Sequence, residues 1–111
     1  MSNAEDKIVE FLKVLAHPIR LQIIEILKND EKNVGDIQDD LGKSQSTTSQ
    51  HLKILTDADL LKSRKDGLCS FYKIKNQEIH ELILRIEKFI SEQERENIKD
   101  LTTSTINDIL S

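Results

Sequence analysis

The sequence predicts a mainly α-helical fold that is closed by one small β-hairpin. Apolar residues recur with helical spacing in four successive segments before residue 61. A short turn at residues 42–44 joins the third and fourth of these segments, and an Asp66-Gly67 pair separates two later segments of strand character. The order helix, helix, helix, helix, hairpin, helix predicts a winged helix-turn-helix.

The first two helices are separated by a proline. Ile8, Phe11, Leu12 and Leu15 follow the i, i+3, i+4, i+7 spacing of one helix face. This helix should end near His17, because Pro18 disfavours helical geometry at the residue before it. Pro18 suits the first turn of a second helix, and we interpret His17 as structural. The second helix carries the apolar residues Ile19, Ile23, Ile24 and Leu27.

The third and fourth helices form the predicted helix-turn-helix. In the third helix Val34, Ile37 and Leu41 point inward, and Gly42 supplies its C-terminal stop. The fourth helix lies in "SQSTTSQHLKIL", residues 44–55, with Ser44 or Ser46 as its N-cap. Its inward face is made by Thr48, Leu52 and Leu55, so the first turns present only polar side chains outward.

Beyond Leu61 the pattern changes to that of a hairpin and a final helix. "LLKSRK" and "LCSFYKI" flank the turn, with Leu68, Phe71 and Ile74 expected along the second strand. Asn76 is a plausible N-cap for a last helix with a long apolar stripe. We expect residues 1–92 to form the winged domain and residues 93–111 a C-terminal helical extension associated with a dimer.

Charge is distributed unevenly along the chain. The net charge is −4, yet residues 43–75 hold seven lysines and arginines against three aspartates. A basic segment in an acidic protein is typical of local phosphate binding, although scattered solvated lysines would look alike.

No apolar run is long enough to span a bilayer, and the N-terminus lacks the pattern of a signal peptide. With a single cysteine, Cys69, the sequence predicts a cytoplasmic protein.

The polar start of the fourth helix predicts contact with DNA. A recognition helix enters the major groove with its N-terminal residues, where small polar side chains reach bases and phosphates. Lysines and arginine on the hairpin would contact the backbone beside it. A solvent-exposed polar helix is the structural alternative. The candidate DNA-binding residues are Ser44, Gln45, Ser46, Thr47, Gln50, His51 and Lys53 on the helix, and Lys62, Arg64 and Lys65 on the wing.

Three stretches resemble the ArsR/SmtB family of small dimeric transcriptional repressors. They are "LKVLAHPIRLQIIEIL", "SQSTTSQHLKILTDADLL" and the hairpin ending "FYKI", and the resemblance covers roughly residues 8–92. Two positions depart from the family pattern: Asp59 stands where the family usually has glycine, and Cys69 where an aromatic residue is common. Both departures bear on how the wing is set.

The resemblance implies a dimer that pairs through the first and last helices. The sequence supports this independently, because the last helix has more apolar surface than a hairpin could cover. Intrachain core is the alternative for any single residue. A twofold dimer would favour a palindromic operator in double-stranded DNA. The expected interface residues are Phe11, Leu15, Ile79, Leu82, Ile83, Ile86, Phe89 and Ile90.

Neither metal site known in such relatives is complete in the sequence. The third-helix region "NVGDIQDDLG" has no cysteine or histidine. On the last helix, one alignment places Asn76, Glu78, Phe89 and Glu92 at the ligand positions, and a shifted one places Glu78, His80, Ser91 and Glu94 there. Neither makes a zinc shell, so we predict no metal and no cofactor, and the effector stays unidentified.

The leading hypothesis is a homodimeric, sequence-specific DNA-binding transcriptional regulator that acts as a repressor. The alternative is a winged-helix module that binds proteins and does not read DNA. Redox sensing by Cys69 and cation binding by Asp36, Asp39 and Asp40 are weaker readings than packing and a solvated surface. An enzyme is not indicated, because no phosphate loop, nucleophile motif or complete metal shell is present.

Overall fold

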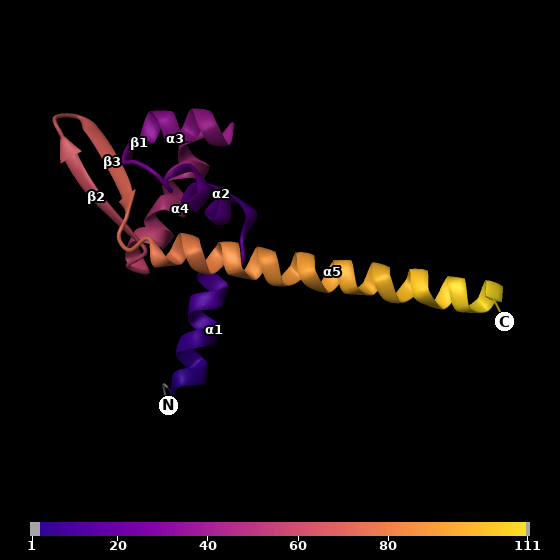
Figure 1. The fold of residues 1–111 in the computed structure, drawn as a ribbon. Helices are drawn as coiled ribbons and strands as arrows, with labels where there is room; N and C mark the ends of the chain where they lie inside the picture. The colour runs from indigo at the N-terminus through magenta and orange to yellow at the C-terminus, as the bar shows by residue number, and fades with distance from the viewer. Residues whose placement is uncertain (1–2, 111) are drawn as a thin grey trace. The chain divides into compact units, whose positions relative to one another are not determined.

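A computed structural model describes residues 3–110, without the side chains of residues 102–107 and 110. The chain forms two units, residues 1–80 and residues 81–111. The elements, labelled in Figure 1, are α1 (Ala4–Leu15), α2 (Pro18–Ile26), β1 (Lys32–Asn33), α3 (Val34–Leu41), α4 (Gln45–Asp57), β2 (Leu61–Asp66), β3 (Cys69–Ile74) and α5 (Glu78–Leu110). The predicted winged helix-turn-helix is confirmed.

The helix boundaries follow the predicted capping residues. The His17 side chain caps α2 by accepting a hydrogen bond from the Ile19 N–H, and Pro18 occupies the first turn. Gly42 ends α3 in the left-handed conformation, with a φ of 65°. Ser44 caps α4. The helix-turn-helix is therefore built by local chemistry that the sequence displays.

The wing belongs to a three-stranded antiparallel sheet in the order β1-β3-β2. β1 pairs Lys32 with Tyr72 and Asn33 with Phe71 on the outer edge of β3. This strand was not predicted, because two residues are too few to show the alternation of a strand. Its effect is to tie the segment that follows α2 to the wing.

The second wing strand begins one residue later than predicted. Leu68 was expected to supply an apolar side chain along this strand, but it lies in the two-residue loop between paired Asp66 and Cys69 and is fully exposed. Gly67 takes the first loop position with a φ of 64°, which glycine tolerates. Cys69, which we had interpreted as a packing residue, is exposed.

Asp59 occupies a left-handed turn after α4. Its φ is 65°, so the position where relatives usually carry glycine does require the conformation that glycine favours. The Lys75 ammonium pairs with the Asp59 carboxylate across the base of the wing. Asp59 therefore adopts the left-handed conformation although it is not a glycine.

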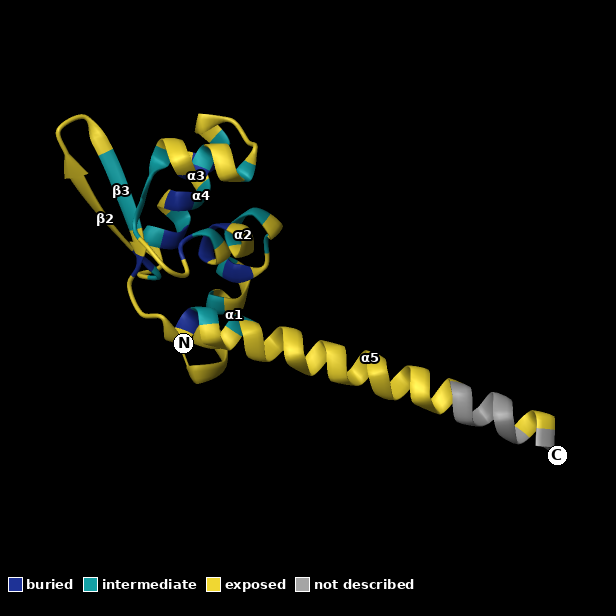
Figure 2. Ribbon diagram, turned by 45° about the horizontal axis from the view of Figure 1, so that its top comes forward, coloured by how far each residue is buried: buried dark blue, intermediate teal, exposed yellow. Residues whose placement is uncertain are grey.

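The core lies among α2, α3, α4 and the base of the wing, with one residue each from the end of α1 and the start of α5. Figure 2 shows the buried segments. The hydroxyl of buried Thr48 donates to the Ser44 carbonyl at 2.8 Å, so its polar atom is satisfied. The buried apolar residues are Leu15, Ile23, Ile24, Leu27, Ile37, Leu52, Leu55, Leu61, Ile74 and Ile79.

The last helix, α5, is continuous from Glu78 to Leu110. It thus runs without a break through residue 92, where we placed the boundary between the winged domain and its extension. Asn76 accepts a hydrogen bond from the Glu78 N–H at 3.0 Å, as its predicted capping role requires. In the part of the chain that the structure describes, no helix is long and apolar enough to cross a membrane.

We predict that Gly42→Ala lowers the free energy of unfolding by about 1 kcal/mol, because a left-handed residue with a Cβ is disfavoured. Nothing lies within 4 Å of the added Cβ, so backbone strain is the whole effect. Urea denaturation measures the loss. Gly42→Asn is the control and should lose less, since asparagine tolerates this conformation; equal losses would contradict the explanation.

Candidate nucleic-acid interface

The outer face of α4 carries a line of polar side chains. Ser46, Gln50 and Lys53 are spaced i, i+4, i+7 and are exposed. The opposite face is the buried set of Thr48, Leu52 and Leu55. The leucines therefore fix which side of the helix faces solvent, as the sequence predicted.

Two more polar residues flank this line. Gln45, in the first turn, is exposed. Ser49, one turn further on, is also exposed, although it is not among the predicted DNA-binding residues. Its i+4 spacing from Gln45 was the signal that could have found it.

Ser44 and Thr47 are engaged with each other at the helix start. The Ser44 hydroxyl accepts a hydrogen bond from the Thr47 N–H at 3.1 Å and donates to the Thr47 hydroxyl at 3.0 Å. Thr47 is half-buried. Both predicted DNA contacts therefore also build the cap that presents the first turn.

His51, one of the predicted DNA-binding residues, does not lie on the outer line and has partners within the chain. Its Nδ1 accepts a hydrogen bond from Arg20 Nε at 3.1 Å, and its ring centroid lies 4.3 Å from that of His17. It is half-buried against α2. The pattern of α4 alone could not show this, because the partners come from another helix.

Arg20 links three helices at this point. Besides His51, it donates from Nη1 to the carbonyl oxygens of Val14, at 3.0 Å, and Lys13, at 3.4 Å, at the end of α1. Burial lowers the pKa of His51, and nearby His17 and Arg20 lower it further. The neutral ring that accepts the Arg20 hydrogen bond is thus the favoured form.

The two faces of the wing differ in charge. The strand register pairs Lys62 with Lys73 and Arg64 with Phe71 on one face. Lys65 pairs with Ser70 on the other, because successive strand residues alternate. Arg64 and Lys65, which are adjacent in sequence, therefore point to opposite sides of the hairpin.

Arg64 is held by a neighbouring carboxylate and a ring. Its Nε lies 3.0 Å from both Glu31 oxygens, its Nη2 lies 2.6 Å from Oε1, and its guanidinium carbon lies 4.4 Å from the centroid of Phe71. The hydrogen bonds lower the pKa of Glu31 and raise that of Arg64. Arg64 stays 52% exposed, so it can still be reached from solvent.

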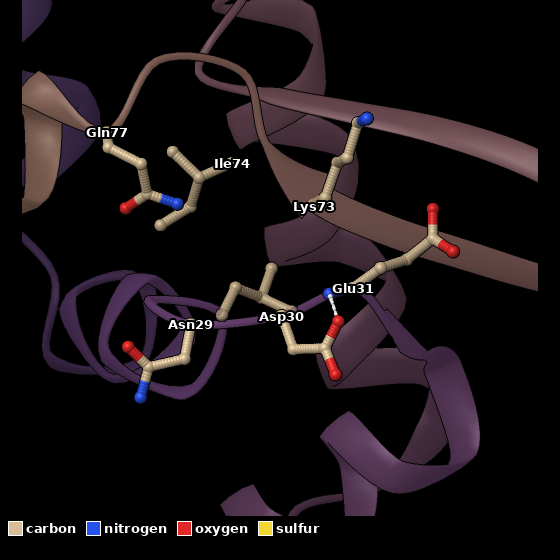
Figure 3. Close-up of a pocket in the computed structure, with 7 residues that line it drawn as sticks. Asn29, Asp30, Glu31, Lys73, Ile74 and Gln77 are labelled. Carbon is tan, nitrogen blue, oxygen red and sulfur yellow. Dashed lines mark hydrogen bonds between the residues drawn. The ribbon is translucent and has the colours of Figure 1, made fainter.

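A pocket of about 350 Å³ lies beside Glu31, between the end of α2 and strand β3. Figure 3 shows that the Asp30 carboxylate accepts a hydrogen bond from the Glu31 N–H. The Glu31 carboxylate points away from the Asp30 carboxylate. The buried parts of the wall are Leu27 and Ile74, and polar side chains form the rest of the lining: Asn29, Asp30, Glu31, Lys73 and Gln77.

Comparison with known proteins agrees with this geometry. A model of the bacterial regulatory proteins of the arsR family matches residues 17–63. The transcriptional repressor PagR of Bacillus anthracis is 40% identical over 84 residues, which span 75% of this chain and 82% of PagR. The transcriptional activator HlyU of Vibrio cholerae is 36% identical over 83 residues, with 75% and 77% covered.

The chain belongs to the arsR family. Among solved structures, the homodimeric winged helix-turn-helix DNA-binding domain Mb0332 of Mycobacterium bovis matches with a TM-score of 0.68 and 25% identity, over 84% of this chain and 90% of that one. This arsR-family protein is a winged helix-turn-helix transcriptional regulator, as the sequence motifs indicated.

The predicted interface residues of this regulator divide by burial. Leu15 and Ile79 are 5% and 7% exposed, so both belong to the core of the chain and offer a partner little surface. Phe11 and Ile83 are half-buried. Leu82, Ile86, Phe89 and Ile90 on α5 are exposed. Ile8, Val9 and Leu12 on α1 are exposed as well, although none of them is among the predicted interface residues.

Two of the residues considered as cation ligands, His80 and Asp40, pair with other side chains. His80 Nε2 lies 2.9 Å from Glu25 Oε2, and Asp40 pairs with Lys32 at 3.0 Å. Within the described residues, no cluster of three or more histidine, cysteine or acidic side chains is arranged to hold a metal ion.

We predict that acidification destabilises the protein partly through His51. Its folded-state pKa lies below the ordinary 6.5, so the unfolded chain binds the proton more readily and stability falls as pH drops below that value. His51→Asn keeps an acceptor for Arg20 but does not titrate there. Thermal melts between about pH 8 and about pH 5.5 should show a smaller loss in this variant; equal losses would contradict the assignment.

Proposed function

We propose that the protein is a homodimeric repressor that binds a palindromic operator, with α4 in the major groove and the wing on the adjacent backbone. The observation that carries the proposal is the two-sided α4: Thr48, Leu52 and Leu55 anchor it while its outer line stays polar and exposed. Membership in the arsR family supports the same reading. It would act in the cytoplasm, beside the DNA.

Each exposed side chain of α4 has a chemical role in this proposal. Gln45 and Gln50 read base edges, since a glutamine amide can donate and accept at adenine. Ser46 and Ser49 bind phosphate near the helix N-terminus, whose partial positive charge favours anions. Lys53 contacts the backbone, and its 2.9 Å pair with Asp57 is exposed enough to open.

The wing supplies contacts that do not depend on sequence. Lys62 and Arg64 share one face of the hairpin, and Lys65 lies on the other. Only one face can lie against a given backbone strand, so we assign the main phosphate contacts to Lys62 and Arg64. Lys65 then reaches the far side of the minor groove.

Exposed apolar side chains support a homodimer. On α5 the exposed residues Leu82, Ile86, Phe89 and Ile90 form a stripe at helical spacing, and on α1 Ile8 and Leu12 are about half exposed. Patches of this kind mark interfaces in soluble proteins. The solved relative Mb0332 is homodimeric. A twofold pair would place two copies of α4 at successive major grooves.

Repression would follow from occupation of a promoter by the dimer. PagR is named a repressor and HlyU an activator, so the sign of regulation depends on where the operator lies relative to the promoter. Transcription in vitro decides between repression and activation. The template carries a binding site selected from random-sequence duplex DNA. Transcript should fall as protein is added; a rise would contradict repression.

We predict that Gln50→Ala relaxes base preference at one operator position, at a cost of about 1–3 kcal/mol in specific binding. Sites are first selected from random-sequence duplex DNA, and affinities are then compared for the selected and a scrambled duplex. Lys62→Ala is the control and should weaken both duplexes alike. Unchanged discrimination by Gln50→Ala would contradict the reading role, and failure to select any site would favour the protein-binding alternative.

We predict that Phe89→Glu dissociates the dimer. Phe89 is 60% exposed within the chain, so the substitution spares the core and instead places a charge in the proposed interface. Sedimentation equilibrium measures the mass. Ser91→Glu adds the same charge at a neighbouring exposed position off the stripe and should leave the dimer intact. A Phe89→Glu dimer of wild-type strength would place the interface elsewhere.

A further inference from the structure

The ion pair between Glu31 and Arg64 joins segments that lie far apart in sequence. Glu31 precedes β1, and Arg64 lies in the middle of β2, thirty-three residues later. The carboxylate engages only one edge of the guanidinium, through Nε and Nη2. Phe71, the cross-strand neighbour of Arg64, lies under the plane of the same group.

Strand β1 places Glu31 at this position. Pairing of Lys32 with Tyr72 and of Asn33 with Phe71 fixes the backbone next to Glu31 against β3. The Glu31 N–H also donates to the Asp30 carboxylate at 2.8 Å. The Glu31 side chain is 25% exposed against 52% for Arg64, so the carboxylate is the more enclosed partner.

We infer that Glu31 and Phe71 are positioning residues for Arg64, which they hold ready to bind a DNA phosphate; this rests on the function proposed above. A guanidinium has five N–H donors in a rigid plane, and Glu31 leaves the Nη1 edge outside the pair. Nη1 lies 4.0 Å from Asp66 Oδ2, too far for a hydrogen bond. A phosphate can bind that edge without displacing Glu31.

The energetic benefit lies in the DNA complex. An exposed ion pair adds little to folding stability. A free arginine, however, loses considerable rotamer entropy when it is fixed on a phosphate, and here the fold has already fixed it. The opposite model has Glu31 compete with phosphate for Arg64, and it predicts that neutralising Glu31 tightens binding.

The test compares Glu31→Gln, Arg64→Ala and the double variant on a fluorescent random-sequence duplex over a series of salt concentrations. Asp30→Asn is the matched control: it removes a neighbouring negative charge, leaves the Arg64 pair intact and keeps an acceptor for the Glu31 N–H. Thermal melts of each variant show that the fold is retained.

We expect Glu31→Gln to weaken DNA binding about threefold to tenfold. The slope of log affinity against log salt concentration should become less steep by up to about 0.9, the change expected for loss of one phosphate contact. Asp30→Asn should bind as tightly as wild type or tighter. In the Arg64→Ala background Glu31→Gln should weaken binding no further. Unchanged or tighter DNA binding by Glu31→Gln would overturn the inference. So would an equal loss of affinity from Glu31→Gln in the Arg64→Ala background. Failure of the wild type to bind duplex at low salt would overturn the proposed function as well.

Discussion

The packing of Thr48, Leu52 and Leu55 into the core is the interaction on which the proposed DNA-binding surface depends. These residues are fully buried, and they orient α4 so that its remaining faces are left to polar side chains. Because the side chains of a helix are fixed around its axis, burying one face leaves the opposite face exposed. The apolar pattern of α4 thus both anchors the helix in the core and determines which of its polar side chains are exposed.

Polar contacts refine this placement. The cap formed by Ser44 sets where α4 begins, and Arg20 holds the middle of the helix through His51 while it also binds carbonyls at the end of α1. On the wing, Glu31 does for Arg64 what Arg20 does for His51. In both cases a side chain from one segment contacts a side chain of a proposed DNA-binding element, so these two side chains are held in place by contacts within the chain.

The sequence predicted those features that local patterns determine. Pro18, Gly42 and Ser44 marked helix ends correctly, because capping depends on a few adjacent residues. Contacts between distant segments left no such trace. β1 is two residues long and is recognisable only by its pairing with β3. The pattern of α4 placed His51 on the outer face, because its hydrogen bond with Arg20 of α2 cannot be predicted from that pattern. Leu15 and Ile79 carry the same apolar signal as interface residues, so their burial needed the structure.

The most direct measurement of the central claim is an NMR titration of isotope-labelled protein with a selected duplex. We expect the largest amide shifts at the start of α4, at Gln45, Ser46 and Gln50, and a second group on the wing around Arg64. Backbone amides of buried Leu52 and Leu55 should shift little. Shifts confined to α1 or α5, with the start of α4 unchanged, would show that α4 does not bind the duplex.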